Sequence, residues 1–153
     1  MKQYTINGRF FAKKLSGQER FAREMMAELD KICKPGEFEI VTSEYAKDIP
    51  EYKNIKVIKY GKVKSHFWEQ INLWWYLVKN KKTGVNLCTT CPLLKPDINT
   101  IHDISMTVNK QWYNNLYGRM SRIWHEFMKF TTFHFAKKVF TVSEFSKSEM
   151  IRV

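Results

Sequence analysis

A histidine and an aspartate stand side by side where the sequence predicts the end of a strand. Ile101-His102-Asp103 closes a short segment, residues 99–102, that is typical of a β-strand. An imidazole there, with a carboxylate beside it, can hold a substrate hydroxyl or transfer a proton. The alternative is a loop histidine and an aspartate that caps the next turn. Because ligands of parallel α/β sheets bind beyond the carboxyl ends of the strands, His102 and Asp103 are the candidate catalytic residues.

A loop before the first predicted helix carries residues that could bind a phosphate. Its sequence is Leu15-Ser16-Gly17-Gln18-Glu19-Arg20, and Gly17 lacks a Cβ atom that would keep a ligand from the backbone. The helix that follows presents unpaired N–H groups and the positive end of its dipole. Ser16 and Glu19 also form a capping box, so an ordinary capped loop explains the same pattern. The candidate substrate-binding residues of this loop are Ser16, Gly17, Gln18 and Arg20.

A second junction between a strand and a helix carries two serines. Thr141-Val142-Ser143-Glu144-Phe145-Ser146 follows a predicted strand, and either serine could bind a ligand hydroxyl or phosphate. Ser146 stands three residues before Glu149, which predicts a capping box and a helix that begins there. Capping alone would account for Ser146. Ser143 and Ser146 are candidate substrate-binding residues.

Two polar residues interrupt an aromatic helix that is predicted from Ser65 to about Asn80. Its aromatic residues recur at helical spacing, which is typical of a core. Glu69 and Gln70 do not fit that core and could point into a cleft, so both are candidate substrate-binding residues. The remaining histidines have ordinary explanations. His66 is placed at a helix start, and His125 and His134 lie within a helix rich in aromatic residues, where packing or solvent exposure explains them.

Cys88-Thr89-Thr90-Cys91 is too incomplete to predict a metal centre. A structural zinc site needs four ligands, normally two such pairs, and only Cys33 remains. Pro92 and Pro96 predict a loop rather than the helix that a thioredoxin-like motif would begin. We therefore expect no metal-binding residues.

Hydrophobic periodicity predicts strands that alternate with helices along the chain. Such alternation gives a mainly parallel sheet with helices on both faces. We therefore expect a single α/β domain over residues 1–153. The predicted strands are residues 2–7, 38–42, 55–60, 85–88, 99–102 and 138–142, and the predicted helices begin at Ser16, Ser65, about Arg119 and Ser146.

The composition excludes several classes of protein. Of 153 residues 44% are hydrophobic, with 6 Gly and 4 Pro, which excludes a disordered chain. Three cysteines exclude a disulfide scaffold and, with no apolar run near Met1, predict a reducing cytoplasm. The most apolar stretch, residues 71–78, is too short to cross a bilayer. The net charge of +11 predicts an anionic partner: nucleic acid, a phosphate-bearing ligand or an anionic membrane.

The last predicted helix is cut short. Val153 lies four residues after Glu149, and an isolated turn of helix is unstable. We therefore expect the chain to be the front part of a longer protein.

Four segments carry a joint family resemblance: Ile6-Asn7-Gly8-Arg9-Phe10 with residues 15–24, then Phe67-Trp68-Glu69-Gln70, residues 100–105 and residues 140–147. Their order and separation resemble the first domain of a family 4 glycosyltransferase over nearly the whole chain. The resemblance implies a GT-B fold, in which two Rossmann-like three-layer domains face a cleft. This chain would be the N-terminal, acceptor-side domain.

The resemblance also implies an activity. Such enzymes transfer a sugar from a nucleotide-sugar to an acceptor hydroxyl with retention at the anomeric carbon, without a metal or another cofactor. The loop at Gly17 would lie near the donor phosphates or the acceptor, His102 near the donor sugar, and Ser143 in the lining of the cleft. Backbone N–H groups and cationic side chains would stabilise the charge that develops on the leaving diphosphate.

In the family the second domain supplies most of the nucleotide site, and its motifs are absent from these 153 residues. We therefore expect a metal-independent, hexosyltransferase-type domain that is inactive alone and serves bacterial-type polysaccharide synthesis. Its partners would be a nucleotide-sugar and a glycan or lipid-linked acceptor. Its expected location is the cytoplasm, with peripheral contact to anionic lipid, where each basic residue adds about 1 kcal/mol of attraction. The competing hypothesis is a basic, non-catalytic Rossmann-like module that binds nucleic acid or a protein.

Overall fold

A computed structural model describes residues 3–152, except for the side chains of residues 106, 110 and 113. Within that range six strands form one sheet, and every pairing between neighbours is parallel. The strands are β1 (Tyr4–Asn7), β2 (Phe38–Thr42), β3 (Lys56–Lys59), β4 (Thr83–Asn86), β5 (Ile98–Thr100) and β6 (Lys138–Phe140).

The strand order is β3-β2-β1-β4-β5-β6, so the sheet grows first to one side of β1 and then to the other. This is the order of a Rossmann-like domain, and the direction of growth reverses between β1 and β4. At such a reversal the crossover connections diverge, which leaves a crevice beyond the carboxyl ends of the two strands. The predicted fold class, an α/β three-layer domain on a parallel sheet, is confirmed.

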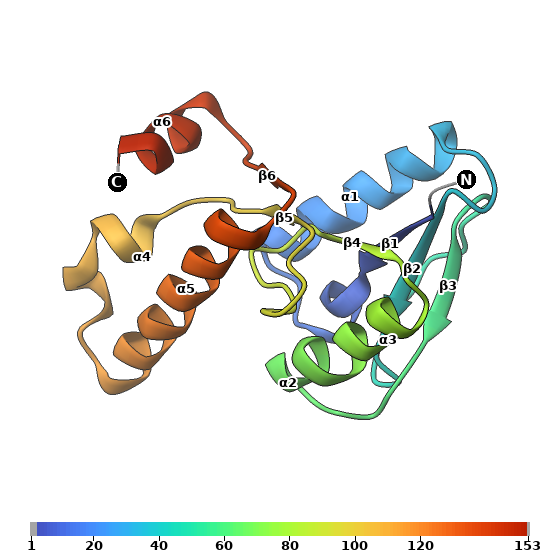
Figure 1. The fold of residues 1–153 in the computed structure, drawn as a ribbon, viewed down its shortest axis with the longest axis horizontal. Helices are drawn as coiled ribbons and strands as arrows, with labels where there is room; N and C mark the ends of the chain where they lie inside the picture. The colour runs from blue at the N-terminus through green and yellow to red at the C-terminus, as the bar shows by residue number, and fades with distance from the viewer. Residues whose placement is uncertain (1–2, 153) are drawn as a thin grey trace.

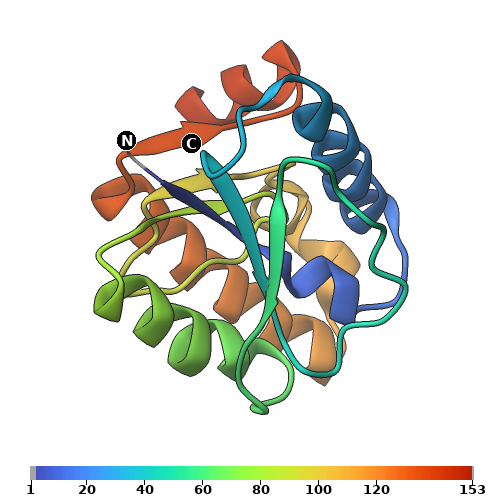
Figure 2. The same cartoon turned by 90° about the vertical axis from the view of Figure 1, so that its right-hand side faces the viewer.

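Helices cover both faces of the sheet (Figures 1 and 2). The helix α1 packs on one face, whereas α2, α3 and α5 lie side by side on the other. A π-helical stretch, η2, joins α2 to α3. The helical segments are η1 (Gly8–Ala12), α1 (Gly17–Ile32), α2 (His66–Trp68), η2 (Glu69–Leu73), α3 (Trp74–Lys79), α4 (Ser105–Val108), η3 (Lys110–Tyr113), α5 (Leu116–Phe135) and α6 (Glu144–Arg152).

Two apolar clusters lie on opposite faces of the sheet. Because side chains alternate along a strand, neighbours in β2 join different clusters. Ile40 packs with Ala22 and Met26 of α1, and Val41 packs with Leu77 of α3. These clusters fix both helices relative to the carboxyl edge of the sheet.

Most predicted elements are present, with ends that differ by a few residues. The strand predicted at residues 38–42 is β2 with the same bounds, whereas β4 begins two residues before the predicted segment 85–88. Because β5 ends at Thr100 and β6 at Phe140, His102 and Ser143 both lie in the loops that follow.

The prediction that Ser146 begins the last helix was wrong. The helix α6 begins at Glu144, and Ser143 Oγ accepts a hydrogen bond of 3.1 Å from the backbone N–H of Ser146. Ser143 is therefore the capping residue, because its hydroxyl satisfies a backbone donor that the first helical turn leaves unpaired. Ser146 lies inside that turn.

Of the aromatic residues predicted as core in the helix after Ser65, Trp68 and Tyr76 are buried, whereas Phe67 and Trp75 are exposed. The helical segments α2–α3 and α5 carry apolar residues around more of their circumference than the sheet can cover, and periodicity does not say which of these residues meet it. The side that faces the sheet includes Trp68 and Leu77 on α2–α3 and Met128 on α5. The exposed residues are Phe67, Ile71, Trp75 and Val78 on α2–α3, and Met120, Ile123 and Phe127 on α5.

Among residues 3–152, every helix is too short or too polar to span a bilayer.

Two glycines provide a matched test of how tightly the segment after β1 packs against β2. A Cβ atom on Gly8 would lie 2.6 Å from Ile40 Cγ2 and 2.8 Å from the carbonyl oxygen of Val41, whereas one on Gly17 would meet nothing within 4 Å. We predict that Gly8→Ala lowers the free energy of unfolding by about 1–3 kcal/mol through overpacking. Gly17→Ala, the control, leaves it unchanged or higher. Urea denaturation measures both, and equal stability of the two variants would contradict the described packing.

Candidate functional site

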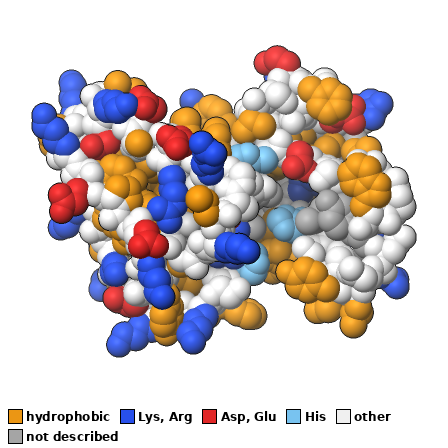
Figure 3. Space-filling model, turned by 180° about the vertical axis from the view of Figure 1, so that it is seen from behind, with side chains coloured by type: hydrophobic (Ala, Val, Ile, Leu, Met, Phe, Trp, Pro, Cys, Tyr) orange, Lys and Arg blue, Asp and Glu red, His pale blue; other side chains and the backbone are white. Residues whose placement is uncertain are grey.

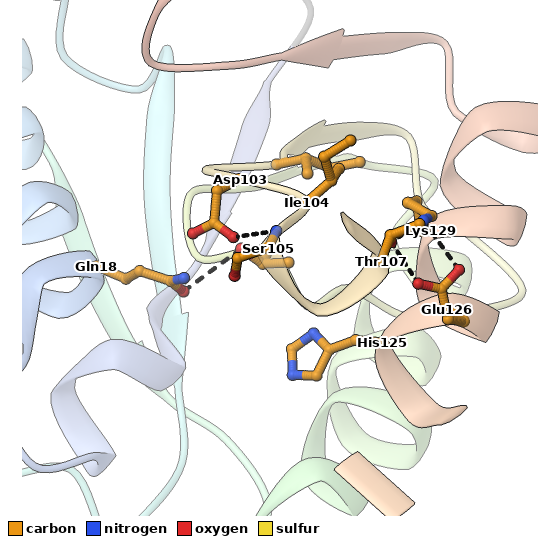
Figure 4. A pocket seen from close by; sticks show the side chains of 10 residues that line it. Gln18, Asp103, Ile104, Ser105, Thr107, His125, Glu126 and Lys129 are labelled. Carbon is orange, nitrogen blue, oxygen red and sulfur yellow. Dashed lines mark hydrogen bonds and ion pairs between the residues drawn. The ribbon is translucent and has the colours of Figure 1, made fainter. Parts of the chain in front are cut away.

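A cavity of about 180 Å³ opens beyond the carboxyl ends of β4 and β5 (Figure 4). Gln18 of α1 borders it on one side, and His125 and Lys129 of α5 border it on the other. The loop after β5 lies between them, and an ion pair of 2.9 Å joins Lys129 to Glu126. The lining residues are Gln18, Thr89, Ile101, Asp103, Ile104, Ser105, Thr107, His125, Glu126 and Lys129.

A larger cavity, of about 500 Å³, lies beyond the carboxyl ends of β1, β2 and β3. Arg9, Lys13 and Lys64 line it, and none of the described residues in its lining is acidic. On the surface, Lys and Arg side chains gather over the half that contains α1, and histidines lie along its junction with the more apolar half (Figure 3). This basic cavity is suited to an anionic ligand.

A buried ion pair lies where the strand order reverses. Arg9 Nη1 donates to Glu69 Oε2 at 2.7 Å, and the two residues are 8% and 1% exposed. The other carboxylate oxygen of Glu69 accepts from Asn7 Nδ2 at 2.7 Å and from Thr90 Oγ1 at 2.9 Å. Arg9 Nη1 also donates to Thr90 Oγ1 at 2.9 Å. These bonds tie the segment after β1, the π-helical stretch η2 and the loop after β4 to one another.

Asparagines at neighbouring positions extend this network across the sheet. Asn7, Asn86 and Asn99 lie at or near the ends of β1, β4 and β5, and all three are buried. Asn7 Nδ2 donates to Asn86 Oδ1 at 3.0 Å. Asn99 Nδ2 donates to the carbonyl oxygen of Thr89 at 3.0 Å and to Thr132 Oγ1 at 2.9 Å. The row therefore holds the loop after β4 and the end of α5 against the carboxyl edge.

Two histidines, His66 and His125, are close enough to Arg9 and Lys13 to be affected by their charges. Arg9 Nη2 donates to His66 Nε2 at 3.3 Å, which requires a neutral ring at that nitrogen. Burial, together with the positive charges of Arg9 and Lys13, lowers the pKa of His66 to about 4. Burial and the charge of Lys13 also lower the pKa of His125. Both rings are therefore neutral at pH 7, so each offers one donor and one acceptor nitrogen.

The predicted loop at the start of α1 contributes one residue to the cavity lining. Gln18 lines the 180 Å³ cavity and accepts a hydrogen bond of 3.4 Å from Thr89 Oγ1. Ser16 is the N-cap residue, but its hydroxyl bonds to the Glu19 carboxylate and not to a backbone N–H. Gly17 faces open space, and Arg20 is exposed. The capping box therefore has its predicted residues without its reciprocal bonds.

Glu19 is a buried acid that holds Lys13 next to the start of α1. Its side chain is 1% exposed and forms an ion pair with Lys13. Burial favours the protonated acid, but hydrogen bonds from Lys13 and Ser16 and the charge of Lys13 outweigh it and lower the pKa of Glu19. The carboxylate is therefore ionised at neutral pH and keeps Lys13 beside the start of α1.

His102 and Asp103 diverge from each other. Asp103 lines the 180 Å³ cavity and accepts a hydrogen bond of 2.8 Å from the backbone N–H of Ser105, as the capping alternative proposes. His102 Nε2 donates to the carbonyl oxygen of Leu87 at 2.8 Å, and its ring packs edge-on against Phe21 at 5.0 Å. Because Nε2 is bonded to backbone, Nδ1 is the nitrogen of His102 that remains for a ligand.

Glu69 and Gln70 have their polar atoms directed into the protein. Glu69 serves the buried ion pair. Gln70 Nε2 donates to the carbonyl oxygen of Cys91 at 2.9 Å, and Gln70 Oε1 accepts from the backbone N–H of Leu93 at 2.9 Å. Both residues position the loop after β4, and neither lines the 180 Å³ cavity.

The two serines lie at a separate place on the same edge. Ser143 lines a cavity of about 730 Å³ beside β6 and α6, which shares no lining residue with the 180 Å³ cavity. The structure therefore brings Gln18 and Asp103 together in the lining of the 180 Å³ cavity, leaves His102 outside that lining, and leaves Ser143 and Ser146 apart.

Several lining residues were not predicted from the sequence. Arg9 offers a signal, because it follows the first strand as closely as His102 follows β5. His125, Glu126 and Lys129 lie on a long helix, and their helical spacing does not show which part of it reaches a cavity.

Within residues 3–152, no group of three or more His, Cys, Asp or Glu side chains is placed to hold a metal ion. Burial raises the pKa of the Cys88 and Cys91 thiols to about 12.

The ion pair can be tested by removing its acid. Glu69→Leu leaves the Arg9 guanidinium buried without its charge partner, so we predict a loss of about 3–5 kcal/mol in the free energy of unfolding. The control is Glu28→Leu, which breaks the exposed Glu28–Lys31 pair and is expected to cost less than about 1 kcal/mol. Urea denaturation followed by circular dichroism measures both, and similar small losses would show that the buried pair is not a central constraint.

The lowered pKa of His66 predicts a dependence of stability on pH. The unfolded chain takes up a proton on this histidine near its ordinary pKa of 6.5, whereas the folded chain does so only near 4. Stability is therefore lost as the pH falls from 6.5 towards 4. We predict that His66→Gln loses less stability than the wild type between pH 7 and pH 5, as measured by urea denaturation. His134→Gln, at an exposed site, serves as the control, and an unchanged pH slope in His66→Gln would contradict the assignment.

Comparisons with protein-family models, with curated proteins and with solved structures found no match to this chain.

Proposed function

We propose that this chain is the acceptor-side domain of a retaining, metal-independent glycosyltransferase. The donor is a nucleotide-sugar, whose site lies mostly in a second domain outside these 153 residues. The acceptor is a glycan or a lipid-linked glycan, and the chain alone is inactive. The proposal rests on the resemblance of four segments to family 4 glycosyltransferases.

The observation that best supports the proposal is the position of the cavities. They lie at the carboxyl edge of a Rossmann-like sheet, on both sides of the reversal in strand order. Gln18 comes from the first turn of α1 and Asp103 from the loop after β5, two of the segments that carry the resemblance. A ligand held there would contact both, as a substrate bound between two domains requires.

The charges of this edge suit a reaction that releases a diphosphate. Negative charge grows on the leaving group during glycosyl transfer, and nearby cations stabilise it. Arg9, Lys13 and Lys64 line the basic cavity. In this proposal Nδ1 of His102 accepts a hydrogen bond from a sugar hydroxyl, since Nε2 already donates to Leu87.

The same charge supports a location at a membrane surface. A net charge of +11 attracts anionic lipid, and we propose that the protein acts in the cytoplasm with peripheral contact to the inner face of the membrane.

Transfer is tested with the product of the complete gene, a radiolabelled nucleotide-sugar and a membrane extract as acceptor. We predict that His102→Ala and Gln18→Ala each lower kcat/KM by roughly tenfold or more, because each loses a contact made in the transition state. Leu94→Ala, at a site that is 81% exposed, is the control. A complete product that transfers no sugar would contradict the proposal. Micromolar binding of a nucleotide-sugar to residues 1–153 in isothermal titration would contradict the division between two domains.

The alternative is a non-catalytic module that binds nucleic acid or a protein. The specific observation in its favour is the same basic cavity, because phosphates of a nucleic acid would also suit Arg9 and Lys64. A gel-shift assay over a range of salt concentrations separates the two hypotheses. Tight binding that weakens steeply with salt supports the nucleic-acid module, since phosphate contacts release counterions.

A further inference from the structure

An apolar groove separates the start of α2 from the first half of α5. Its volume is about 740 Å³, which lies within the range of sites for small molecules. Phe67 forms one wall, and Met120, Ile123 and Phe127 form the other. These side chains are between 52% and 68% exposed, although they are large and apolar. A continuous apolar surface of this kind marks a binding site more often than chance exposure does.

The groove shares a lining residue with each of the two polar cavities. Ser65 lines the groove and the basic cavity, and His125 lines the groove and the 180 Å³ cavity. His66 also lines the groove and accepts a hydrogen bond from Arg9, whose side chain lies in the basic cavity. The apolar groove therefore adjoins a cavity lined by three cations, of which Arg9 pairs with Glu69 and Lys13 pairs with Glu19.

Two residues in the lining of the groove each carry an unpaired polar atom. Within the described residues, Trp124 Nε1 and His66 Nδ1 are buried and have no hydrogen-bond partner, although His66 Nδ1 lies 4.0 Å from Glu69 Oε2. The two rings contact each other edge-on, with their centroids 5.8 Å apart. Buried donors are normally satisfied, so an orphaned indole N–H indicates a ligand acceptor atom at this place.

We propose that the groove holds the hydrocarbon tail of a single phosphate-bearing lipid whose headgroup lies among Arg9, Lys13 and Lys64. The inference rests on the proposed function and deepens it, because it makes the acceptor a lipid-linked one. A tail in the groove places the phosphate at the carboxyl edge, next to the cavity that contains Gln18 and Asp103. A second copy of the chain fits less well, since it would bring the same net charge of +11 to a basic surface.

Dodecyl phosphate, below its critical micelle concentration, tests the proposal by isothermal titration against residues 1–153. The expected result is saturable binding of one molecule per chain. Two probes separate the parts of the ligand: dodecyltrimethylammonium keeps the tail and reverses the head charge, and inorganic phosphate keeps only the head. Each should bind at least about tenfold more weakly than dodecyl phosphate. Equal binding of the cationic probe would overturn the headgroup site, and equal binding of inorganic phosphate would overturn the tail site.

Variants locate the bound tail. Phe127→Asp places a charge in the groove, and Leu94→Asp places the same charge at a site outside it that is 81% exposed. Both positions are exposed, so both variants should fold, which circular dichroism verifies. Phe127→Asp should weaken the binding of dodecyl phosphate by about tenfold or more, and Leu94→Asp should not. Lys64→Glu should weaken dodecyl phosphate and not dodecyltrimethylammonium. Unchanged binding in Phe127→Asp would overturn the proposal.

Other occupants of the groove give different results. A concentration-dependent dimer in sedimentation equilibrium that Phe127→Asp abolishes would assign the groove to a second copy. Binding to anionic vesicles without any binding of monomeric dodecyl phosphate would assign it to a bilayer surface. Either result overturns the single-lipid site. Binding of dodecyl phosphate uses no donor, so a complete product that transfers no sugar would refute the proposed function and leave the lipid site standing.

Discussion

The buried ion pair between Arg9 and Glu69 is the constraint on which the carboxyl edge of this sheet depends. Both charges are withdrawn from water, which is tolerable only because Asn7 and Thr90 complete their hydrogen bonds. The four groups come from the end of β1, the segment after it, the π-helical stretch and the loop after β4. One electrostatic interaction therefore fixes the relative positions of three segments that are distant in sequence. The π-helical register at Glu69 fits this role, since such stretches recur where a helix must present a residue at a functional position.

The row of asparagines, Asn7, Asn86 and Asn99, extends this hydrogen-bond network along the carboxyl edge of the sheet. Asn86 bonds to the carbonyl oxygens of Pro96 and Ile98, and Asn99 bonds to Thr89 and Thr132. Amides suit this task because each supplies two donors and an acceptor in a space that the pleat of the sheet limits. The loops that border the 180 Å³ cavity are thus held in place by the uncharged side-chain amides of Asn86 and Asn99. Gln18, Asp103 and Lys129 present polar side chains to this cavity, where Asp103 accepts a bond from Ser105 and Lys129 pairs with Glu126.

The exposed apolar residues of α2–α3 and α5 give the molecule an apolar surface next to the basic cavity. A parallel sheet of six strands buries one side of α2–α3 and of α5, and part of the exposed apolar side, including Phe67 and Phe127, forms the walls of a groove. His66 and His125 both line this groove, and burial, together with the charges of Arg9 and Lys13, keeps both rings neutral at pH 7. Apolar and cationic surfaces in contact provide complementary sites for the two ends of an amphiphile.

The sequence by itself determined the α/β class, the order of most elements and the start of α1, because hydrophobic periodicity and capping are local properties of the chain. It also indicated that Glu69 does not fit an aromatic core, although it predicted a cleft residue there and not a buried ion pair. Only the tertiary structure decided what the partner of Glu69 is, which apolar residues of each helix meet the sheet, and that Ser143 rather than Ser146 caps α6. The reason is physical: strand order, helix facing and buried pairing depend on contacts between residues that are far apart in the chain. Local pattern carries no record of those contacts.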